Sequence, residues 1–293
     1  MQLKQIILSN FIGLLFTDFM FANKTILLTG ATDGIGLQTA GELAKLNIKL
    51  ILHGKNPDKG NKIIEKLISE TGNTNIHYYN VDLSSFKMIE GFTAKINADF
   101  NQLDILINNA GIYESNKVIL QNGLEKSFMV NYLSSFVLTL QLLPSLKKGK
   151  ESKIINLSSM VHASNIDFEN LNAEKSYSGS DAYSLSKLCN ILFTYKLAEL
   201  LKNDKVSVNA LHPGVINTKL LRAGWGPFGN ATIEGAKRIM FLVKMSNFVT
   251  GKYFENDKQI KSAAISYDKN IQNQLWDYSI KTANKFLQKP IKL

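Results

Sequence analysis

The chain of 293 residues contains a single cysteine, Cys189, so an internal disulfide and a cysteine-rich zinc site are both excluded. A chain without disulfides suits a reducing compartment. Cys189 lies in the stretch LSKLCNILF, whose apolar, helical pattern predicts a buried structural thiol rather than a reactive one. We therefore expect a cytoplasmic protein without a metal site.

Proline is also scarce, with five residues in the whole chain, and neither a low-complexity tract nor a repeat of solenoid length is present. These absences argue against a long linker or a repeat array. Hydrophobic residues make up 45% of the sequence, which is enough to bury a large core. We expect one compact unit.

Acidic residues are outnumbered, with 24 Asp and Glu against 34 Lys and Arg, which gives a net charge of +10. The lysines are spread along the whole chain, and no basic block with interleaved aromatic residues appears. This pattern argues against a nucleic-acid partner. A cationic surface that attracts a phosphorylated cofactor or an anionic membrane is the better interpretation.

The first 22 residues, MQLKQIILSNFIGLLFTDFMFA, are apolar but do not suit a spanning helix. Asp18 at membrane depth would cost about 2.5–3.5 kcal/mol, and the apolar stretch is shorter than the ~20 residues of a span. Polar residues recur every four positions along one helical stripe, at Gln5, Ser9, Gly13 and Thr17. The pattern predicts either an interfacial helix in peripheral contact with a membrane or a helix docked on the protein. We therefore treat residues 1–23 as an amino-terminal segment distinct from the domain that follows.

From residue 24 onward, short apolar strands alternate with helical patterns. The predicted strands are Thr25–Thr29, Lys49–His53, His77–Val81, Asp104–Ile107, Lys153–Leu157, Val206–Leu211 and Lys252–Glu255. The predicted helices are Leu37–Leu46, Lys59–Glu70, Lys87–Phe100, Gly123–Lys148, Asp181–Lys202 and Gln272–Phe286. Apolar strands separated by helices are typical of a parallel sheet covered on both faces. The expected fold is α/β, a single Rossmann-type, doubly wound sheet of about seven strands over residues 24–293.

The octapeptide TGATDGIG, residues 29–36, follows the first predicted strand and opens the first predicted helix. At such a junction, missing side chains and free helix amides let a pyrophosphate approach the backbone. The spacing is G-x-x-x-G-x-G rather than the commoner G-x-G-x-x-G. Taken alone, the motif does not exclude a turn whose glycines serve only for close packing.

The glycine motif resembles the cofactor loop of the short-chain dehydrogenase/reductase family, and further motifs follow in that family's order. VDLS at 81–84 resembles the segment whose acid receives the adenine, and NNAG at 108–111 resembles the one whose backbone supports the cofactor. HPGVINTKL at 212–220 resembles the loop that holds the nicotinamide end. The implied cofactor-binding residues are Gly30, Thr32, Asp33, Gly34, Ile35, Gly36, Lys55, Asn56, Asp82, Leu83, Asn109, Ala110, Gly111, Tyr183, Lys187, Pro213, Gly214 and Thr218.

The family's catalytic set is matched by Asn131 in MVNYL, Ser159 in NLSS, and Tyr183 and Lys187 in YSLSK. A tyrosine is a poor acid–base catalyst at neutral pH because its ordinary pKa is about 10. Lys187 lies four residues on, on the same helix face, and we expect its charge to lower the pKa of Tyr183. The resemblance implies that Tyr183 exchanges the proton and Ser159 orients the substrate oxygen. It further implies that Lys187 holds the nicotinamide ribose and that Asn131 supports a water chain to Lys187.

Within the family, the chain resembles the retinol dehydrogenase-like branch in the stretches SDAYSLSKLCNILFTYKLAELL, LHPGVINTKLLR and TGKYFE. The wide gap between Ser159 and Tyr183 and the position of His162 are similar as well. We interpret His162 and His212 as structural rather than catalytic.

The end of the second predicted strand bears on the cofactor. NAD-specific sheets usually carry an acid there, whereas a basic residue suits a 2′-phosphate. This chain has Gly54 at the acid's position and Lys55 next to it, which favours NADP(H) over NAD(H). Asp33 argues the other way, because some NADP enzymes have a basic residue at its position.

The segment 219–247 is expected to cover the active site as a loop and helix, by analogy with the family's variable region. Its large apolar residues could line a pocket or pack as core, namely Trp225, Phe228, Met240, Phe241 and Val243. The substrate expected from this is an apolar aldehyde, ketone or secondary alcohol, as for a carbonyl reductase, and only the branch suggests a retinoid or steroid. The rival hypothesis is a non-catalytic NADP(H)-binding sensor or scaffold. The sequence leaves open whether the protein forms a homo-oligomer.

Overall fold

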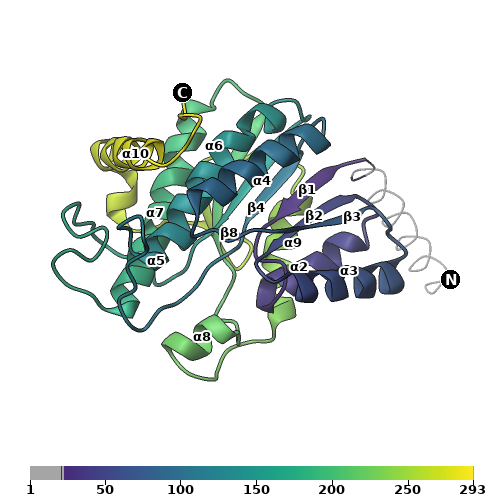
Figure 1. Cartoon of the computed structure of the whole chain (residues 1–293), viewed down its shortest axis with the longest axis horizontal. Helices are drawn as coiled ribbons and strands as arrows, with labels where there is room; N and C mark the ends of the chain where they lie inside the picture. The colour runs from purple at the N-terminus through teal and green to yellow at the C-terminus, as the bar shows by residue number, and fades with distance from the viewer. Residues whose placement is uncertain (1–20, 22, 293) are drawn as a thin grey trace.

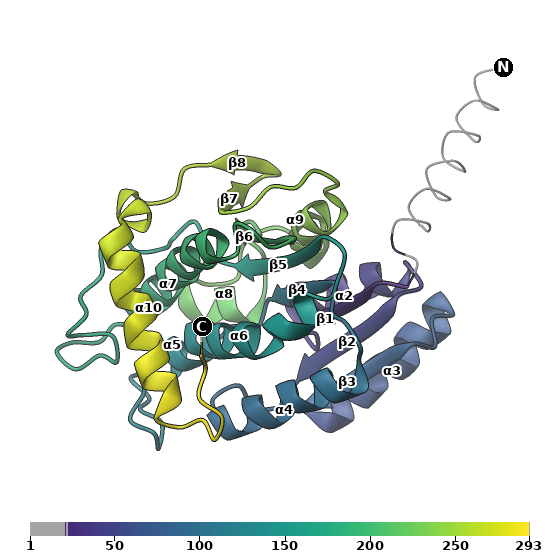
Figure 2. The same ribbon diagram turned by 90° about the horizontal axis from the view of Figure 1, so that it is seen from above.

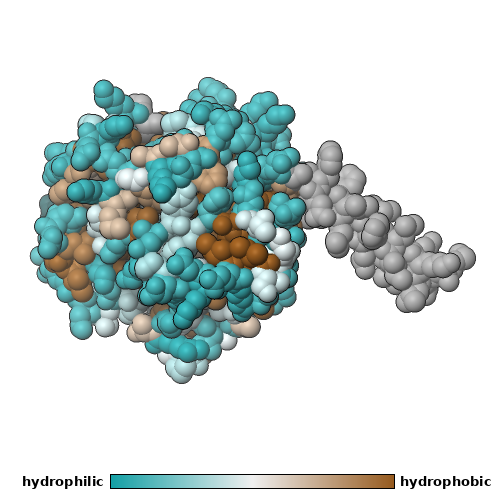
Figure 3. Space-filling model, turned by 45° about the vertical axis from the view of Figure 1, so that its right-hand side comes forward, coloured by the Kyte–Doolittle hydropathy of each residue, from teal (hydrophilic) through white to brown (hydrophobic). Residues whose placement is uncertain are grey.

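The structure is a computed structural model that describes Phe21 and residues 23–292. The expectation for residues 1–22 lies outside the described part except at Phe21, which is buried. The face of the molecule in Figure 3 is mostly hydrophilic and carries a compact apolar patch.

One mixed sheet of eight strands, in the order β3-β2-β1-β4-β5-β6-β7-β8, forms the centre of the molecule (Figure 2). The strands are β1 (Thr25–Leu28), β2 (Lys49–Gly54), β3 (Ile76–Asn80), β4 (Ile105–Asn108), β5 (Ser152–Leu157), β6 (Val206–His212), β7 (Lys252–Glu255) and β8 (Lys258–Ile260). β1 to β7 are parallel, and β8 runs antiparallel to β7. The expected parallel sheet is confirmed.

The eighth strand was not expected. β8 contains only KQI, all three residues are exposed, and no apolar pattern marks them. A tight turn through Asn256 and Asp257, both with positive φ, folds β8 back onto β7. Asn and Asp tolerate this left-handed conformation better than most residues, so the turn itself was the available sequence signal.

Helices cover both faces of the sheet (Figure 1). One face carries α2 (Gly34–Ala44), α3 (Pro57–Thr71) and α9 (Thr232–Lys244), and the other carries α4 (Phe86–Asp99), α6 (Ser134–Leu146) and α7 (Gly179–Leu200), with α10 (Lys269–Asn284) against α7. Side chains alternate along the strands. Leu27 of β1 therefore joins the α4–α6–α7 core, while Ile26 and Leu28 join the α2–α9 core. This two-sided burial explains why the strands are apolar at nearly every position.

The predicted helix Gly123–Lys148 begins later than expected and is interrupted. The Glu125 carboxylate accepts hydrogen bonds from the amides of Ser127 and Phe128, and α5 (Lys126–Phe128) starts there. A π-helical turn, η1 (Met129–Leu133), then precedes α6. The stretch Lys126–Leu146 is apolar and long enough to cross a membrane, but 83% of its most apolar window is buried, as in the core helix of a globular fold.

The strand order reverses between β1 and β4, because β1 leads to β2 on one side while β4 leads to β5 on the other. The connections that leave these two strands therefore run in opposite directions. In doubly wound sheets this reversal opens a crevice at the carboxyl ends of the strands, where ligands bind.

Candidate active site

A cavity of about 620 Å³ lies at the carboxyl ends of the strands, where this crevice is expected. It is lined by 18 of the 20 predicted site residues, all except Asn56 and Asn131. The fold therefore brings together segments that are up to about 190 residues apart, from the glycine loop to the loop after β6. We first describe the glycine-loop end and then the Tyr183 end.

The glycine loop is packed too closely for side chains at two positions. Gly30 has a φ of +65°, and a Cβ there would lie 2.8 Å from the Cα of Ala110. A Cβ on Gly36 would lie 2.0 Å from the carbonyl oxygen of Gly30. These glycines let the loop fold onto itself and onto the NNAG segment, and they leave the amino end of α2 facing the cavity. The packing interpretation therefore applies, and it does not conflict with the phosphate interpretation.

Two polar side chains hold this loop. The Asn109 amide donates to the carbonyl oxygens of Thr29 (2.8 Å) and Gly30 (3.1 Å). The Gly30 amide donates to Nδ1 of His53 (3.2 Å), so Nε2 carries the proton and donates to the Val81 carbonyl (3.0 Å). Burial lowers the pKa of His53 to about 4, which keeps the ring neutral. Sequence reasoning missed His53, although a histidine closing an apolar strand was a visible signal.

At the end of β2, Gly54 has no room for a side chain, because a Cβ would lie 2.6 Å from Thr32 Cγ2. Lys55 is exposed and lines the cavity. Asn56 lies outside the cavity and caps α3 by accepting from the Lys59 amide (2.8 Å). It therefore takes part in the fold rather than in the cavity lining.

Asp33 is paired with two cations. One carboxylate oxygen accepts hydrogen bonds from Nζ of Lys59 (2.9 Å) and of Lys219 (2.8 Å). Burial opposes ionisation, but the bonds from Lys219 and Lys59 outweigh it and lower the pKa of Asp33 to about 2. The negative charge that argued against NADP is therefore compensated.

Tyr183 is buried at the other end of the cavity, near the start of α7. Burial raises its pKa to about 12, although a hydrogen bond with the Ser159 side chain works in the opposite direction. Lys187 Nζ lies 5.4 Å from the Tyr183 ring centroid and donates to the Leu157 carbonyl (3.1 Å). Burial lowers the pKa of Lys187 to about 8. The pKa of Tyr183 is thus raised rather than lowered, because loss of solvent is the largest cause of its shift.

Asn131 lies in the π turn and does not line the cavity. Its side-chain oxygen accepts from the Ile112 amide (2.8 Å), and its Nδ2 donates to the Ile112 carbonyl (3.0 Å). Asn190 Nδ2 donates to the Asn131 carbonyl (3.0 Å) and to the Leu157 carbonyl (3.2 Å). Asn190 was missed, although a polar residue three positions after Lys187 in the apolar run LCNILF was a signal.

His162 links the Ser159 loop to the segment after β8. Nε2 of His162 accepts from the Ala263 amide (2.9 Å), so Nδ1 carries the proton and donates to the Ser159 carbonyl (2.6 Å). This geometry fits the expected structural role. His212 is also buried, which lowers its pKa to about 4 with help from the charges of His162 and Lys187.

Aromatic side chains form the wall beside Tyr183. The Trp225 ring lies 5.4 Å from the Tyr183 ring and 5.1 Å from that of Tyr113. Phe228 also lines the cavity and is 50% exposed.

Of the two alternatives for the apolar residues of α9, pocket lining or core packing, the structure has core packing. Met240 and Val243 join the α2-side core, and the Phe241 ring packs 6.3 Å from that of Phe254. The reason is that the apolar stripe of α9 faces α2 and the sheet, so only α8 (Lys219–Gly224) and the loop after it reach the cavity.

A model of the short chain dehydrogenase family matches residues 24–225. The chain belongs to this family. It is 38% identical over 272 residues to human retinol dehydrogenase 13, covering 86% of this chain and 82% of that one. It is 33% identical over 278 residues to human polyprenol dehydrogenase, covering 88% and 84%. These relatives place it in the retinol dehydrogenase-like branch.

Solved structures agree on the fold. A putative uncharacterized protein from Mycobacterium paratuberculosis superposes with a TM-score of 0.77 at 25% identity, covering 93% of this chain and 96% of that one. A putative short chain dehydrogenase from Escherichia coli, complexed with NADPH, has a TM-score of 0.66 at 23% identity and covers 80% and 97%. Family membership makes the chain an oxidoreductase that acts on CH–OH or C=O groups with a nicotinamide cofactor.

Proposed function

We propose that this protein transfers a hydride between NADP(H) and an apolar aldehyde, ketone or secondary alcohol, with residues 24–293 as the catalytic unit. One observation carries the proposal: Tyr183, Ser159 and Lys187 meet in one cavity with an apolar aromatic wall and with the glycine loop. The glycine loop fits a dinucleotide, because Gly30 and Gly36 leave the helix amides of α2 accessible.

A bound nicotinamide cofactor would supply or accept the hydride. Because the pKa of Tyr183 is about 12, its hydroxyl is protonated at neutral pH and can donate to a carbonyl oxygen during reduction. The Ser159 hydroxyl, which lines the same cavity as Tyr183, would orient that oxygen and stabilise its developing charge. Lys187 would hold the nicotinamide ribose. Asn131 positions the segment after NNAG and would support a water chain to Lys187.

The NADP preference rests on charge. Gly54 excludes an acid at the end of β2, Lys55 is free to approach a 2′-phosphate, and Asp33 is neutralised by Lys59 and Lys219. A 2′-phosphate at this end of the cavity would meet more positive than negative charge, which favours its binding.

The apolar substrate class rests on the wall formed by Trp225 and Phe228, with Tyr113 packed against Trp225. Retinol and polyprenol, from which relatives take their names, are both apolar alcohols. By analogy with the retinol dehydrogenase-like branch alone, we extend the proposed substrate class to a retinoid or a steroid.

The experiment compares oxidation of NADPH and NADH against a panel of apolar aldehydes and ketones, for wild type and Tyr183→Phe. We expect turnover with NADPH that falls at least a thousandfold in the variant, since the proton donor is lost. Tyr195→Phe is the matched control, because Tyr195 lies on the same helix but bonds to Ser262 outside the cavity. Cofactor binding without turnover across the panel would favour the sensor or scaffold.

A further inference from the structure

Two lysines from distant segments converge on one carboxylate oxygen beside the glycine loop. Lys59, in the first turn of α3, and Lys219, the first residue of α8, each donate through Nζ to Oδ2 of Asp33, at 2.9 and 2.8 Å. Their ammonium groups therefore lie within about two hydrogen-bond lengths of each other. We call Lys59 and Lys219 the lysine pair. Two cations facing one carboxylate leave a net positive charge at this point.

The lysine pair lies at the end of the cavity that suits the adenosine ribose of a dinucleotide. A Cβ on Gly54, at the end of β2, would touch Thr32, the residue before Asp33. Lys59 lies in the helix that follows β2, and Lys219 itself lines the cavity. In doubly wound sheets, this strand end receives the ribose 2′-hydroxyl or a 2′-phosphate in its place.

Neither ammonium group is saturated. Each has three N–H donors, and within the described residues each gives a hydrogen bond to Asp33 alone. The side chain of Lys59 is 42% exposed and that of Lys219 is 82% exposed. The other oxygen of the Asp33 carboxylate accepts from the Gly34 amide (2.8 Å). Two donors on each lysine are therefore available to a ligand.

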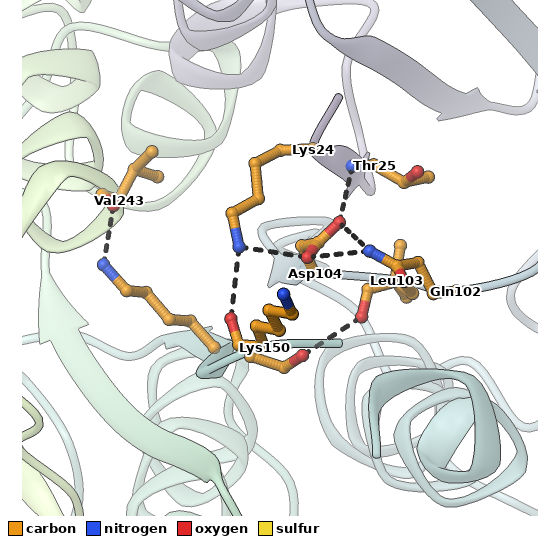
Figure 4. Close-up of polar contacts among 9 residues, drawn as sticks. Lys24, Thr25, Gln102, Leu103, Asp104, Lys150 and Val243 are labelled. Carbon is orange, nitrogen blue, oxygen red and sulfur yellow. Dashed lines mark hydrogen bonds and ion pairs between the residues drawn. The ribbon is translucent and has the colours of Figure 1, made fainter. Parts of the chain in front are cut away.

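Lysines that serve the fold alone have different surroundings. At the opposite end of the sheet, Lys24 Nζ pairs with the buried Asp104 (3.1 Å) and donates to the Lys150 carbonyl (3.1 Å), as Figure 4 shows. Nearby, Lys153 Nζ donates to three carbonyl oxygens at the end of α9, including that of Val243 (2.8 Å). These ammonium groups use most of their donors within the protein, whereas the lysine pair keeps most of its donors free.

The neighbouring Lys55 does not supply the whole charge that a 2′-phosphate suits. Burial opposes the ionisation of Asp82, but hydrogen bonds from Ser84 outweigh it and, with the charges of Lys55 and Lys126, lower its pKa. Lys55 therefore lies close enough to Asp82 for this acid to offset part of its charge. A phosphate monoester carries about −1.5 to −2 at neutral pH and has three acceptor oxygens, so it suits more than one cation.

We propose that Lys59 and Lys219 bind the 2′-phosphate of NADP(H) through their free donors. This inference rests on the proposed NADP preference and assigns it to side chains of α3 and α8, beyond the glycine loop and the end of β2. Contacts between ammonium groups and phosphate oxygens are charge-assisted and therefore stronger than neutral hydrogen bonds. Because α8 leads into Trp225, the same contact ties the adenosine end of the cofactor to the substrate wall.

The test measures binding of adenosine 2′,5′-bisphosphate and of adenosine 5′-monophosphate to the full chain by calorimetry. The two probes differ only in the 2′-phosphate, and neither requires turnover. Lys59→Gln and Lys219→Gln, combined in one variant, should weaken binding of the bisphosphate about tenfold, because charge-assisted hydrogen bonds are lost. Binding of the monophosphate should change little.

A matched control removes the same charge elsewhere, with Lys66→Gln and Lys237→Gln in one variant. Each of these lysines pairs with an acid on its own helix, Glu70 (3.7 Å) and Glu234 (2.7 Å), and neither lines the cavity. The control should bind both probes as wild type does. The thermal midpoint of each variant verifies the fold.

An Asp33→Asn background separates direct binding from simple neutralisation of the acid. If the lysine pair contacts the 2′-phosphate, its replacement by glutamine should still weaken binding of the bisphosphate when the carboxylate is absent. If the two lysines only compensate Asp33, the loss should disappear in this background, and the inference would be wrong.

Two further results would overturn the inference. Equal losses in the test and control variants would mean that total charge matters and the position of the lysines does not. Equal losses for the two probes would assign the lysine pair to the 5′-phosphate. Equal binding of the two probes by wild type would contradict the NADP preference and this inference together. Absence of turnover across the carbonyl panel would contradict the proposed reaction alone.

Discussion

At the scale of single residues, burial decides which groups in this cavity carry charge. Tyr183 and Lys187 are neighbours on α7, and loss of solvent moves the pKa of the tyrosine up and that of the lysine down. Both shifts favour neutral groups. A protonated Lys187 is therefore held at a cost in folding free energy, as expected for a functional residue.

Replacing Lys187 by Met should abolish activity and raise the free energy of unfolding by about 3 kcal/mol at neutral pH. The pKa of Lys187 falls from 10.5 in the unfolded chain to about 8 in the fold, so the folded state disfavours the protonated form. The Leu157 carbonyl keeps a partner, because Asn190 also donates to it.

The sign of the pH dependence follows from the lowered pKa. Wild type gains stability as the pH rises from about 8 to 10.5, since the folded state loses this proton first. The advantage of the Met variant should therefore be full below about pH 8 and should disappear above 10.5. Urea unfolding of both proteins across this range measures it, and an advantage that does not change with pH would contradict the argument.

At the scale of elements, the glycine loop and α2 depend on the absence of side chains at particular points. Gly36 faces the Gly30 carbonyl within the first turn of α2, whereas a Cβ on Gly91, inside α4, would meet no heavy atom of a neighbouring segment within 4 Å. The two helical glycines thus have opposite surroundings, although the sequence presents each as a glycine inside a helix.

Gly36→Ala should therefore abolish cofactor binding and lower the unfolding free energy by more than about 2 kcal/mol, because the added methyl group cannot avoid backbone. Gly91→Ala, the matched control, should leave binding unchanged and stabilise the protein by up to about 1 kcal/mol. Quenching of tryptophan fluorescence by NADPH measures binding, and thermal unfolding measures stability. Normal NADPH binding by Gly36→Ala would refute the close contact.

At the scale of the whole molecule, the cavity exists only because distant segments meet. Asp33 binds Lys219 across 186 positions of sequence, and Tyr113 of the NNAG connection packs on Trp225 after α8. The glycine loop and the segment after β6 thereby enclose one space. The substrate wall is thus a property of tertiary structure.

Trp225→Ala should raise the KM for large apolar substrates at least tenfold while changing NADPH affinity little, because it removes part of the wall beside Tyr183. Phe241→Ala is a matched control, since both side chains are 37% exposed and only Trp225 lines the cavity. Steady-state kinetics with a long and a short aldehyde separate the effects. Equal changes in KM for the two aldehydes would show that Trp225 does not form part of the substrate wall.

The sequence by itself determined the seven parallel strands, the glycine turn and the spacing of Tyr183 and Lys187, because periodicity and four-residue helix spacing are local properties. It also identified the family, through motifs in a characteristic order.

Only the tertiary structure decided how Asp33 is compensated, why Asn131 points at Ile112, and which apolar residues of 219–247 reach the cavity. It also set the pKa of Tyr183. These features depend on burial and on partners far away in the chain, and no local pattern encodes either.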